Sequence, residues 1–478
     1  MASLPFTGSM TSSRISYHLD RLPIGRVHWK VVVAVGLGLF FDMYEVFLSG
    51  SMSVALGKDF RLSGLELKLL LASAFLGMFL GAALLGRLAD RLGRRKAFLF
   101  NLVWYSIWSL VGAFSPNAGF LVFARFMAGI GVGAEYPVAD AYLSDVLPKD
   151  KRGRLATWAY TSSFVAVPVV GFLALWLNTT PMLGISGWRW LLALGGVGAV
   201  VVLFLRRSLP ESPRWLNSVG RTEEARQALE VFAHGAGTSV SELEKAAVRE
   251  ATPGEAVPSQ AAPQSQAAPS IDQDERRSLS HLGKAPYRGR LVMLVIFHVF
   301  QTFGYYGFGT LAALVLVASG HSVTNSLLFT ALSFLGYPIG SLVSTPLVAR
   351  FERKHLLIAS IIALAASGVA FSVSGNDALI VVFGFLTTLI SNVFSNVYHI
   401  YQAEIFPTAL RATAVGWTYS LSRLSSGALP FILLPVLDGF GALAMFGVVA
   451  VALAIIAVTV GILGPRTTRR SLAEINPV

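Results

Sequence analysis

The chain has 478 residues, of which 54% are hydrophobic and only 13% are charged, whereas soluble domains carry about 25% charged residues. This composition excludes an ordinary soluble domain. The absence of cysteine excludes a disulfide framework, a thiolate metal site and a cysteine nucleophile. The net charge of +12 does not indicate nucleic-acid binding, because the basic residues cluster at the ends of apolar segments, as the positive-inside rule expects.

Runs of about 20 apolar residues recur along the chain, and each is long enough to cross about 30 Å of hydrocarbon as a helix. Unbroken runs favour helices over a barrel, whose strands would alternate. We therefore predict an all-α membrane protein with twelve transmembrane helices. The predicted spans are 29–52, 67–89, 96–114, 119–145, 154–177, 188–206, 289–318, 323–349, 355–374, 377–403, 412–436 and 440–463.

A polar segment divides the spans into two groups of six. It contains a short helical stretch at 222–232 and a stretch rich in Ala, Pro, Gln and Ser at 251–270, which predicts a disordered linker. The predicted organisation is an N-terminal segment 1–28, a six-helix half 29–206, a linker 207–288, a second six-helix half 289–463 and a tail 464–478.

Basic residues gather in the loops after even-numbered spans and at both ends of the chain. Lys149 with Arg152 and Arg206 with Arg207 are examples. The opposite loops are short and poor in lysine and arginine, so the positive-inside rule predicts that both termini are cytoplasmic.

The two halves repeat one another. The segment GRLADRLGRRK at 86–96 has a degenerate copy, TPLVARFERKH, 259 residues later. Asp145 and Arg152 are matched at the same offset by Glu404 and Arg411. Two matches at one offset indicate pseudo-symmetric halves, and repeats of this kind build transporters whose site lies between the halves, near the membrane midplane.

These segments carry a family resemblance that covers nearly the whole chain. GRLADRLGRRK resembles the signature loop between the second and third helices of the major facilitator superfamily. Within that superfamily, PESPRWL at 210–216, RFMAGIGVG at 125–133 and EIFPTALR at 404–411 are similar to the branch of sugar porters and organic-ion transporters. The resemblance implies the superfamily's twelve-helix fold and a transport function.

Two further segments narrow the resemblance. FFDMYEVFLSG at 40–50 is similar to an element of bacterial metabolite–proton and aromatic-acid symporters, with Met43 replacing a glycine and Glu45 an aspartate. In HVFQTFGYYGFG, Gln301 stands alone where sugar porters carry paired glutamines. The chain as a whole is most similar to bacterial niacin and aromatic-acid transporters and to synaptic-vesicle-2-like proteins.

Three ionisable residues inside the predicted spans are candidates for proton coupling. At 1.5 Å per residue, Asp42 and Glu45 lie roughly 20 and 24 Å from the inner end of the first span, and Arg125 lies about 9 Å from the outer end of the fourth. All three therefore lie at similar heights in a core of about 30 Å. An acid that pairs with arginine in one conformation and is free in another can bind and release a proton.

The alternative is a static ion pair that fixes the first and fourth helices. Sugar–proton symporters carry an acid on helix 1 and an arginine on helix 4, and this resemblance implies coupling. Either Asp42 or Glu45 could carry the proton.

Arg423 lies roughly 16 Å deep in the eleventh span, with no acid within a turn. A guanidinium binds a carboxylate through two parallel hydrogen bonds, so Arg423 is a candidate for binding an anionic substrate. The segment SRLSSGALP at 422–430 is similar to one in organic anion transporters, where an arginine serves substrate anions. The alternative is a pair with Asp42, Glu45 or Glu135.

Polar and aromatic side chains on other spans complete the candidate substrate site. Tyrosine and glutamine give directional hydrogen bonds, and aromatic faces stack against a ring. The alternative is interhelical hydrogen bonding, worth about 0.6 kcal/mol each. The candidates besides Arg423 are Tyr44, His298, Gln301, Tyr305, Tyr306, Asn392, Asn396, His399 and Tyr419. His399 could also relay a proton.

Acids and arginines at the inner helix ends form a candidate cytoplasmic gate that would bridge the halves when the inner side is shut. The alternative is topogenic positive charge with screened surface pairs worth about 0–1 kcal/mol. The positive-inside rule explains basic residues at these helix ends but not acidic ones, so the acids favour the gate interpretation over the topogenic one. The candidates are Asp90, Arg91, Arg94, Asp145, Arg152, Glu404 and Arg411.

We therefore predict a monomeric transporter of the bacterial inner membrane that couples proton entry to import of a small organic anion, such as nicotinate or benzoate, by alternating access. The alternatives are a sugar or polyol symporter, a drug or metabolite efflux antiporter, and a receptor that has kept the fold. No enzyme activity, cofactor, metal or nucleic-acid partner is expected, because no nucleophile–base pair, metal cluster or ATP-binding motif is found.

Overall fold

The computed structural model describes residues 12–180, 182–250, 283–284, 286–406, 408–468, 470 and 472–475. Within these ranges the backbone is helical apart from turns, short connections and one isolated bridge between Met182 and Ile185. The predicted linker at 251–270 lies outside the described residues.

The first half of the chain forms a bundle in which some spans consist of two consecutive helices. Its helices are α2 (Arg26–Asp59), α3 (Gly64–Leu92), α4 (Arg94–Ala113), α5 (Ala118–Gly133), α6 (Glu135–Val146), α7 (Lys149–Phe164), α8 (Ala166–Thr179) and α9 (Gly187–Arg207). The pairs α5–α6 and α7–α8 each continue across a single residue, so each pair is one span.

The second half forms a similar bundle. Its helices are α14 (Tyr287–Ala318), α15 (Val323–Phe334), α16 (Gly336–Arg350), α17 (Arg353–Val373), α18 (Asp377–Glu404) and α19 (Thr408–Leu463). The 56-residue α19 changes direction at Gly441, whose φ of 82° lies outside the helical region, so α19 contributes two spans.

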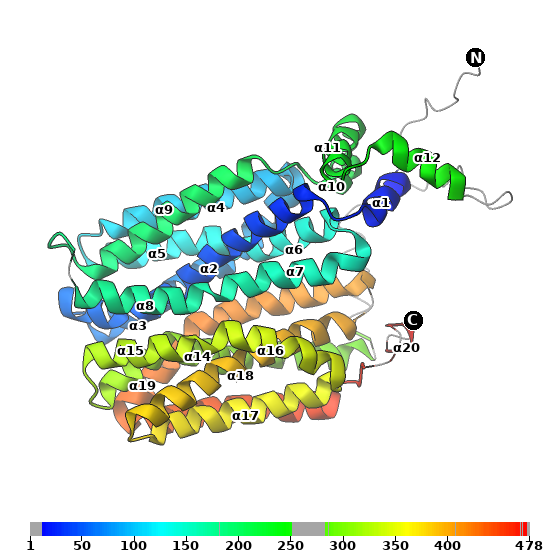
Figure 1. Cartoon of the computed structure of the whole chain (residues 1–478). Helices are drawn as coiled ribbons and strands as arrows, with labels where there is room; N and C mark the ends of the chain where they lie inside the picture. Colours follow the sequence, from blue (N-terminus) through cyan, green and yellow to red (C-terminus); the bar gives the residue numbers. More distant parts are fainter. Residues whose placement is uncertain are drawn as a thin grey trace, which may run out of the picture.

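The predicted fold class is confirmed in the described part of the chain. Ten stretches are long and apolar enough to cross a membrane, and one of them contains the Gly441 bend. The 20-residue α4, which begins with three basic residues, is long enough to cover about 30 Å. These elements make twelve spans. Figure 1 shows them as two groups, α2–α9 and α14–α19, lying side by side.

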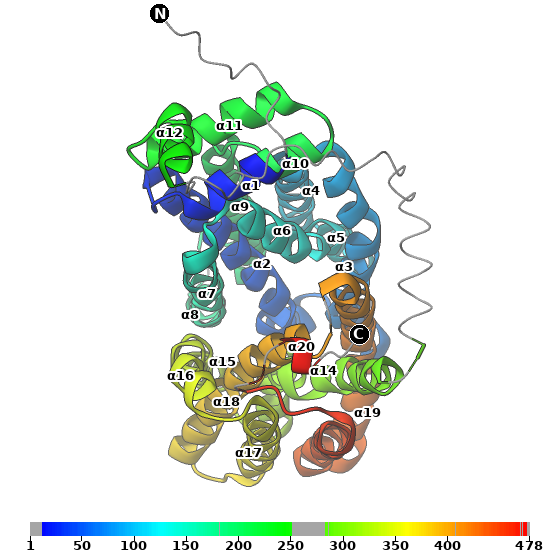
Figure 2. The same ribbon diagram turned by 90° about the vertical axis from the view of Figure 1, so that its right-hand side faces the viewer.

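Short helices cover one end of the first bundle. They are α1 (Ser12–Arg21), α10 (Pro213–Ser218), α11 (Thr222–Gly235) and α12 (Val240–Glu250), and α20 (Leu472–Ile475) lies at the same end of the molecule (Figures 1 and 2). We call this the cap end and the opposite one the far end. Leu19 and Phe232 are buried between these helices, and Asp20 accepts hydrogen bonds from Arg152 and Arg214, at 3.1 and 2.7 Å.

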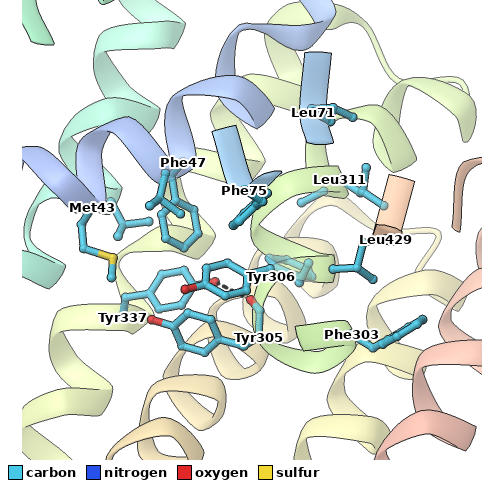
Figure 3. Close-up of a cluster of buried hydrophobic side chains, with 14 of the residues drawn as sticks. Met43, Phe47, Leu71, Phe75, Phe303, Tyr305, Tyr306, Leu311, Tyr337 and Leu429 are labelled. Atoms are coloured by element: carbon cyan, nitrogen blue, oxygen red, sulfur yellow. Dashed lines mark hydrogen bonds between the residues drawn. The ribbon is translucent and has the colours of Figure 1, made fainter. Parts of the chain in front are cut away.

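The two halves meet through α2 with α14, α3 with α19, α8 with α15, and α7 with α16, where the hydroxyl oxygens of Thr161 and Ser341 are 3.0 Å apart. Toward the far end the two backbones approach closely, because a Cβ atom on Gly50 would come within 2.6 Å of the Thr310 carbonyl oxygen. An aromatic layer fills the interface beside this contact, as Figure 3 shows. In it the ring of Phe47 lies 5.3 Å from that of Tyr337. The halves are therefore packed together toward the far end.

The Gly50 contact predicts that Gly50→Ala destabilises the protein. The added methyl group meets backbone rather than a flexible side chain, and such overpacking costs about 1–3 kcal/mol. Gly57→Ala on the same helix is the matched control, because a Cβ atom there meets nothing within 4 Å. That control should gain up to about 1 kcal/mol from helix propensity. Thermal unfolding in detergent measures both, and equal midpoints would contradict the prediction.

Candidate functional site

The first half holds a buried ion pair between Glu45 of α2 and Arg125 of α5. Arg125 also donates to the backbone oxygen of Glu45 and to Oγ of Ser49, both at 2.8 Å. Arg125 is 1% exposed and Glu45 is fully buried. The structure therefore brings together two of the three residues that the sequence placed at similar heights.

Asp42, the third of these residues, is fully buried and unpaired. Neither of its carboxylate oxygens has a hydrogen-bond partner among the described residues. It interacts electrostatically with Glu45 on its own helix, with Glu135 and Arg206 on neighbouring helices, and with Arg423 of the second half. Asp42 therefore lies within electrostatic range of charged groups in both halves.

A second buried ion pair joins Glu135 of α6 to Arg206 of α9. The sequence analysis placed Arg206 in a basic loop beside Arg207. The structure instead buries it to 1% exposure in the last turn of α9, where it donates to the backbone oxygen of Ala34 at 3.1 Å. A Cβ atom on Gly38 would lie 1.7 Å from its Nη2 atom, so the absence of a side chain there makes room for the guanidinium.

Arg423 is buried in the second half, where its hydrogen-bond partners are tyrosine hydroxyl groups. It donates to the hydroxyl groups of Tyr306 at 2.7 Å and Tyr419 at 2.6 Å, and these are its hydrogen-bond partners among the described residues. Its guanidinium carbon also lies 5.7 and 5.0 Å from the centroids of the two rings. Arg423 is 5% exposed. A guanidinium has five N–H donors, so this arrangement leaves donors for another group.

Beside Arg423, hydrogen bonds link the side chains of His298, Gln402 and His399. His298 Nε2 is 3.0 Å from Gln402 Oε1, and Gln402 Nε2 is 3.1 Å from His399 Nδ1. The ring of His298 lies edge-on to that of Tyr419, with centroids 5.8 Å apart. His298 is fully buried, whereas His399 is exposed. These contacts gather predicted site residues of α14, α18 and α19.

Residues of the first half that the sequence analysis missed lie within electrostatic range of this group. The rings of Tyr136 and Tyr160 stack with centroids 6.1 Å apart, and the Tyr160 hydroxyl donates to Asp140. Tyr136 interacts electrostatically with Tyr419 and Arg423, and Asp140 with Tyr419. Tyr136 and Asp140 are four residues apart within an apolar span, a polar pair on one helical face that could have indicated them.

Some predicted substrate residues make contacts within one half. Tyr44 donates to the backbone oxygen of Leu191 at 2.9 Å, Asn392 donates to the backbone oxygen of Tyr337, and Asn396 donates to Ser344 Oγ at 2.7 Å. These contacts are interhelical hydrogen bonds, the alternative considered for the polar stripe.

Two further predicted residues are buried on α14. Tyr305 lies edge-on to Tyr306, with centroids 4.8 Å apart (Figure 3). Gln301 is 3% exposed and makes no hydrogen bond with the residues that the structure describes.

The candidate gate residues pair within their own halves. Asp145 accepts a hydrogen bond from Ser212 at 2.9 Å and lies 3.7 Å from Arg94 Nε, and Glu404 lies 2.9 Å from Arg353 Nε. Arg152 pairs with Asp20, and Arg91 is exposed. The side chains of Asp90 and Arg411 lie outside the described residues. The bridging role of these residues stays a prediction.

Next to the gate, burial raises the pKa of Glu211 although it accepts hydrogen bonds from three backbone N–H groups, those of Ser212, Arg95 and Arg94.

Within the described ranges, no group of three or more His, Asp or Glu side chains is arranged to hold a metal ion.

A family model described as "Sugar (and other) transporter" matches residues 31–478. The chain belongs to this family. The resemblance to the major facilitator superfamily is thereby confirmed, and the protein is a multi-pass membrane transporter.

Relatives and solved structures agree with this assignment. The chain is 31% identical over 416 residues to a putative metabolite transport protein, YyaJ, of Bacillus subtilis, covering 87% of each chain. It is 29% identical over 461 residues to the niacin transporter NiaP of Acinetobacter baylyi, covering 96% of this chain and 98% of the relative. The xylose transporter XylE of E. coli, in a partially occluded inward-open conformation, has the same fold, with a TM-score of 0.70, 22% identity and coverage of 93% and 99%.

The Glu45–Arg125 pair predicts non-additive effects on stability. Arg125→Met should cost about 3–5 kcal/mol because it leaves Glu45 buried without a partner. The double variant Glu45→Gln, Arg125→Met should recover most of this loss, since no unpaired charge remains. Arg91→Met, at an exposed arginine, is the control. Unfolding in detergent measures all three, and a double variant as unstable as the single one would contradict the prediction.

Proposed function

We propose that this transporter imports a small aromatic or heterocyclic carboxylate together with a proton across the bacterial inner membrane. The observation that carries the proposal is Arg423, a guanidinium inside the second bundle whose described hydrogen-bond partners are two tyrosine hydroxyls. A buried cation is costly without a counter-ion, and a carboxylate substrate would supply one.

The surroundings of Arg423 favour a ring on that carboxylate. Tyr306 and Tyr419 lie beside the guanidinium, and Tyr136, which stacks on Tyr160 in the other half, lies within electrostatic range of it. Aromatic side chains hold a planar ring by offset or edge contacts. His298 and Gln301 would add hydrogen-bond groups for ring heteroatoms. The likeness to a niacin transporter over nearly the whole chain supports this substrate class.

A sugar–proton symporter is the second candidate. It is favoured by a relative named an arabinose-proton symporter, which is 26% identical over 472 residues. A neutral sugar would use the hydroxyl and amide groups of the site but would leave the charge of Arg423 without a counter-ion. This favours the carboxylate.

Asp42 supplies the coupling between proton and substrate in this proposal. Since it interacts electrostatically with Arg423, an ionised Asp42 lowers the attraction of the site for an anion. Protonation of Asp42 removes that repulsion, so proton binding and anion binding favour one another. Such coupling is typically worth 5–150-fold in affinity, that is about 1–3 kcal/mol. In the same proposal, the Glu45–Arg125 ion pair forms and breaks during the cycle, and each change alters the charge next to Asp42.

Alternating access follows from how the halves pack. They are in close contact toward the far end, whereas Asp140 and His399, nearer the cap end, are exposed. We infer that this conformation opens toward the cap end and that the cap end, with its basic loops, is cytoplasmic. Opening the other side requires the Gly50–Thr310 contact to part and the gate residues to join the halves.

The role of Arg423 predicts the outcome of counterflow in proteoliposomes. Unlabelled nicotinate or benzoate should drive exchange of its labelled form, and arabinose should not. Arg423→Gln should weaken carboxylate affinity about 10–150-fold, because a hydrogen bond to a charged group is worth about 1.5–3 kcal/mol. Arg221→Gln, at an exposed arginine of the cap, is the control. Exchange of a neutral sugar but of no carboxylate would overturn the proposal.

The role of Asp42 predicts a pH dependence of binding. Carboxylate affinity should rise as the pH falls from about 8 to about 6, a range in which a free carboxylate stays ionised. Asp42→Asn should bind with little pH dependence, and Asp59→Asn should behave as wild type, because Asp59 bonds to Trp188 at the far end. Calorimetric titration measures the affinities. A wild-type slope retained in Asp42→Asn would remove Asp42 from coupling.

A further inference from the structure

Charged side chains line one face of α2 and form what we call the charge column: Asp42, Glu45, Arg125, Glu135 and Arg206. On α2 the positions Gly38, Asp42, Glu45 and Ser49 follow a helical spacing of 4, 3 and 4 residues, so they share one face over about 16 Å. Arg125 binds at the Glu45 end, and the Glu135–Arg206 pair lies against Gly38. Asp42 lies between the two ion pairs.

The column is rich in buried polar atoms without partners. Both Asp42 oxygens have no hydrogen-bond partner among the described residues, whereas Ser109 lies within reach of Glu45 and Asn101 within reach of Glu135. The hydroxyl of Tyr105 on α4 is likewise unpartnered, and Tyr105 interacts electrostatically with all three acids. More than about nine in ten buried polar groups are satisfied in native proteins, so such a concentration of exceptions calls for a function.

The column also has one more carboxylate than guanidinium. The other charged or titratable groups that interact with Asp42 are Tyr105 of α4, Tyr136 of α6 and Arg423 of α19. Arginine stays protonated, so any exchangeable proton belongs to a carboxylate. Binding one proton would neutralise the column, which a low-dielectric interior favours.

We propose that Asp42 and Glu135 carry the transported proton from Glu45 toward the cap end, along a path inside the first half that is separate from the substrate path. This rests on the proposed proton coupling. Arg206 is one residue away from Arg207, which is exposed at the end of α9. The Glu135–Arg206 pair therefore lies at the end of the column nearer the solvent, and Glu45–Arg125 at the other.

Each step moves one proton between oxygens. The O–H bond of protonated Glu45 breaks as one forms on the Asp42 carboxylate, directly or through water, and Glu45 then pairs again with Arg125. Asp42 passes the proton to Glu135 while Arg206 lets go of that carboxylate. Glu135 gives the proton to water and pairs again with Arg206. The arginines keep their protons and set when each acid accepts one.

The test compares proton-driven accumulation with exchange of labelled nicotinate in proteoliposomes. Glu135→Gln should lower accumulation at least tenfold more than exchange, whereas Glu135→Asp, which keeps the carboxylate, should restore part of the accumulation. The double variant Glu135→Gln, Arg206→Gln distinguishes a proton relay from a purely structural ion pair. A structural ion pair is relieved when both charges are removed, but a relay stays broken because no acid remains. Asp59→Asn is the control.

The outcomes distinguish this path from the proposed function. If Glu45→Gln loses accumulation but Glu135→Gln keeps it, the path is wrong and proton coupling stands. If Asp42→Asn keeps accumulation, the proposed coupling itself fails, and if Glu45→Gln alone keeps it, the path does not begin at Glu45. Recovery of accumulation in the double variant would also overturn the path. If Glu135→Gln alone does not fold, the double variant and Glu135→Asp carry the test.

Discussion

The structure depends on an imbalance of charge in the buried interior of the first half. Three carboxylates and two guanidiniums are buried along one face of α2, and Asp42 is the carboxylate without a partner. Burying an unpaired charge is costly, so the column is stable with a proton or with an arginine shared between acids. Because of this constraint, binding and releasing a proton would lower the cost of the buried charge in the proposed mechanism.

The second half has the complementary imbalance. Arg423 is a buried cation held by the hydroxyls of Tyr306 and Tyr419. An anion that binds there neutralises the second half, as a proton neutralises the first, and Asp42 interacts electrostatically with Arg423. In the proposed function, each half thus favours the binding event of the other, and the rocking of the halves would carry both charges as a neutral load.

The sequence predicted the fold well, because apolar runs, loop charges and a 259-residue repeat act locally or by symmetry. It also placed Asp42, Glu45 and Arg125 at similar heights, since depth along a span follows from helix rise, and the structure shows that Glu45 is the acid that pairs with Arg125. It missed Arg206, because an arginine at the end of a span fits a topogenic role, and its burial depends on how α9 packs against Gly38. The stacking of Tyr136 on Tyr160 likewise depends on how α6 and α7 pack together, which cannot be predicted from either segment alone.

The most direct measurement of the central claim is proton uptake on substrate binding, followed with a pH indicator in weakly buffered detergent solution near neutral pH. Linkage requires that, if anion binding at Arg423 favours protonation of Asp42, binding takes protons from solution. The account predicts uptake by the wild-type protein on adding nicotinate or benzoate, and none by Asp42→Asn at saturating ligand. Saturable binding to the wild-type protein with no change in proton concentration would contradict it.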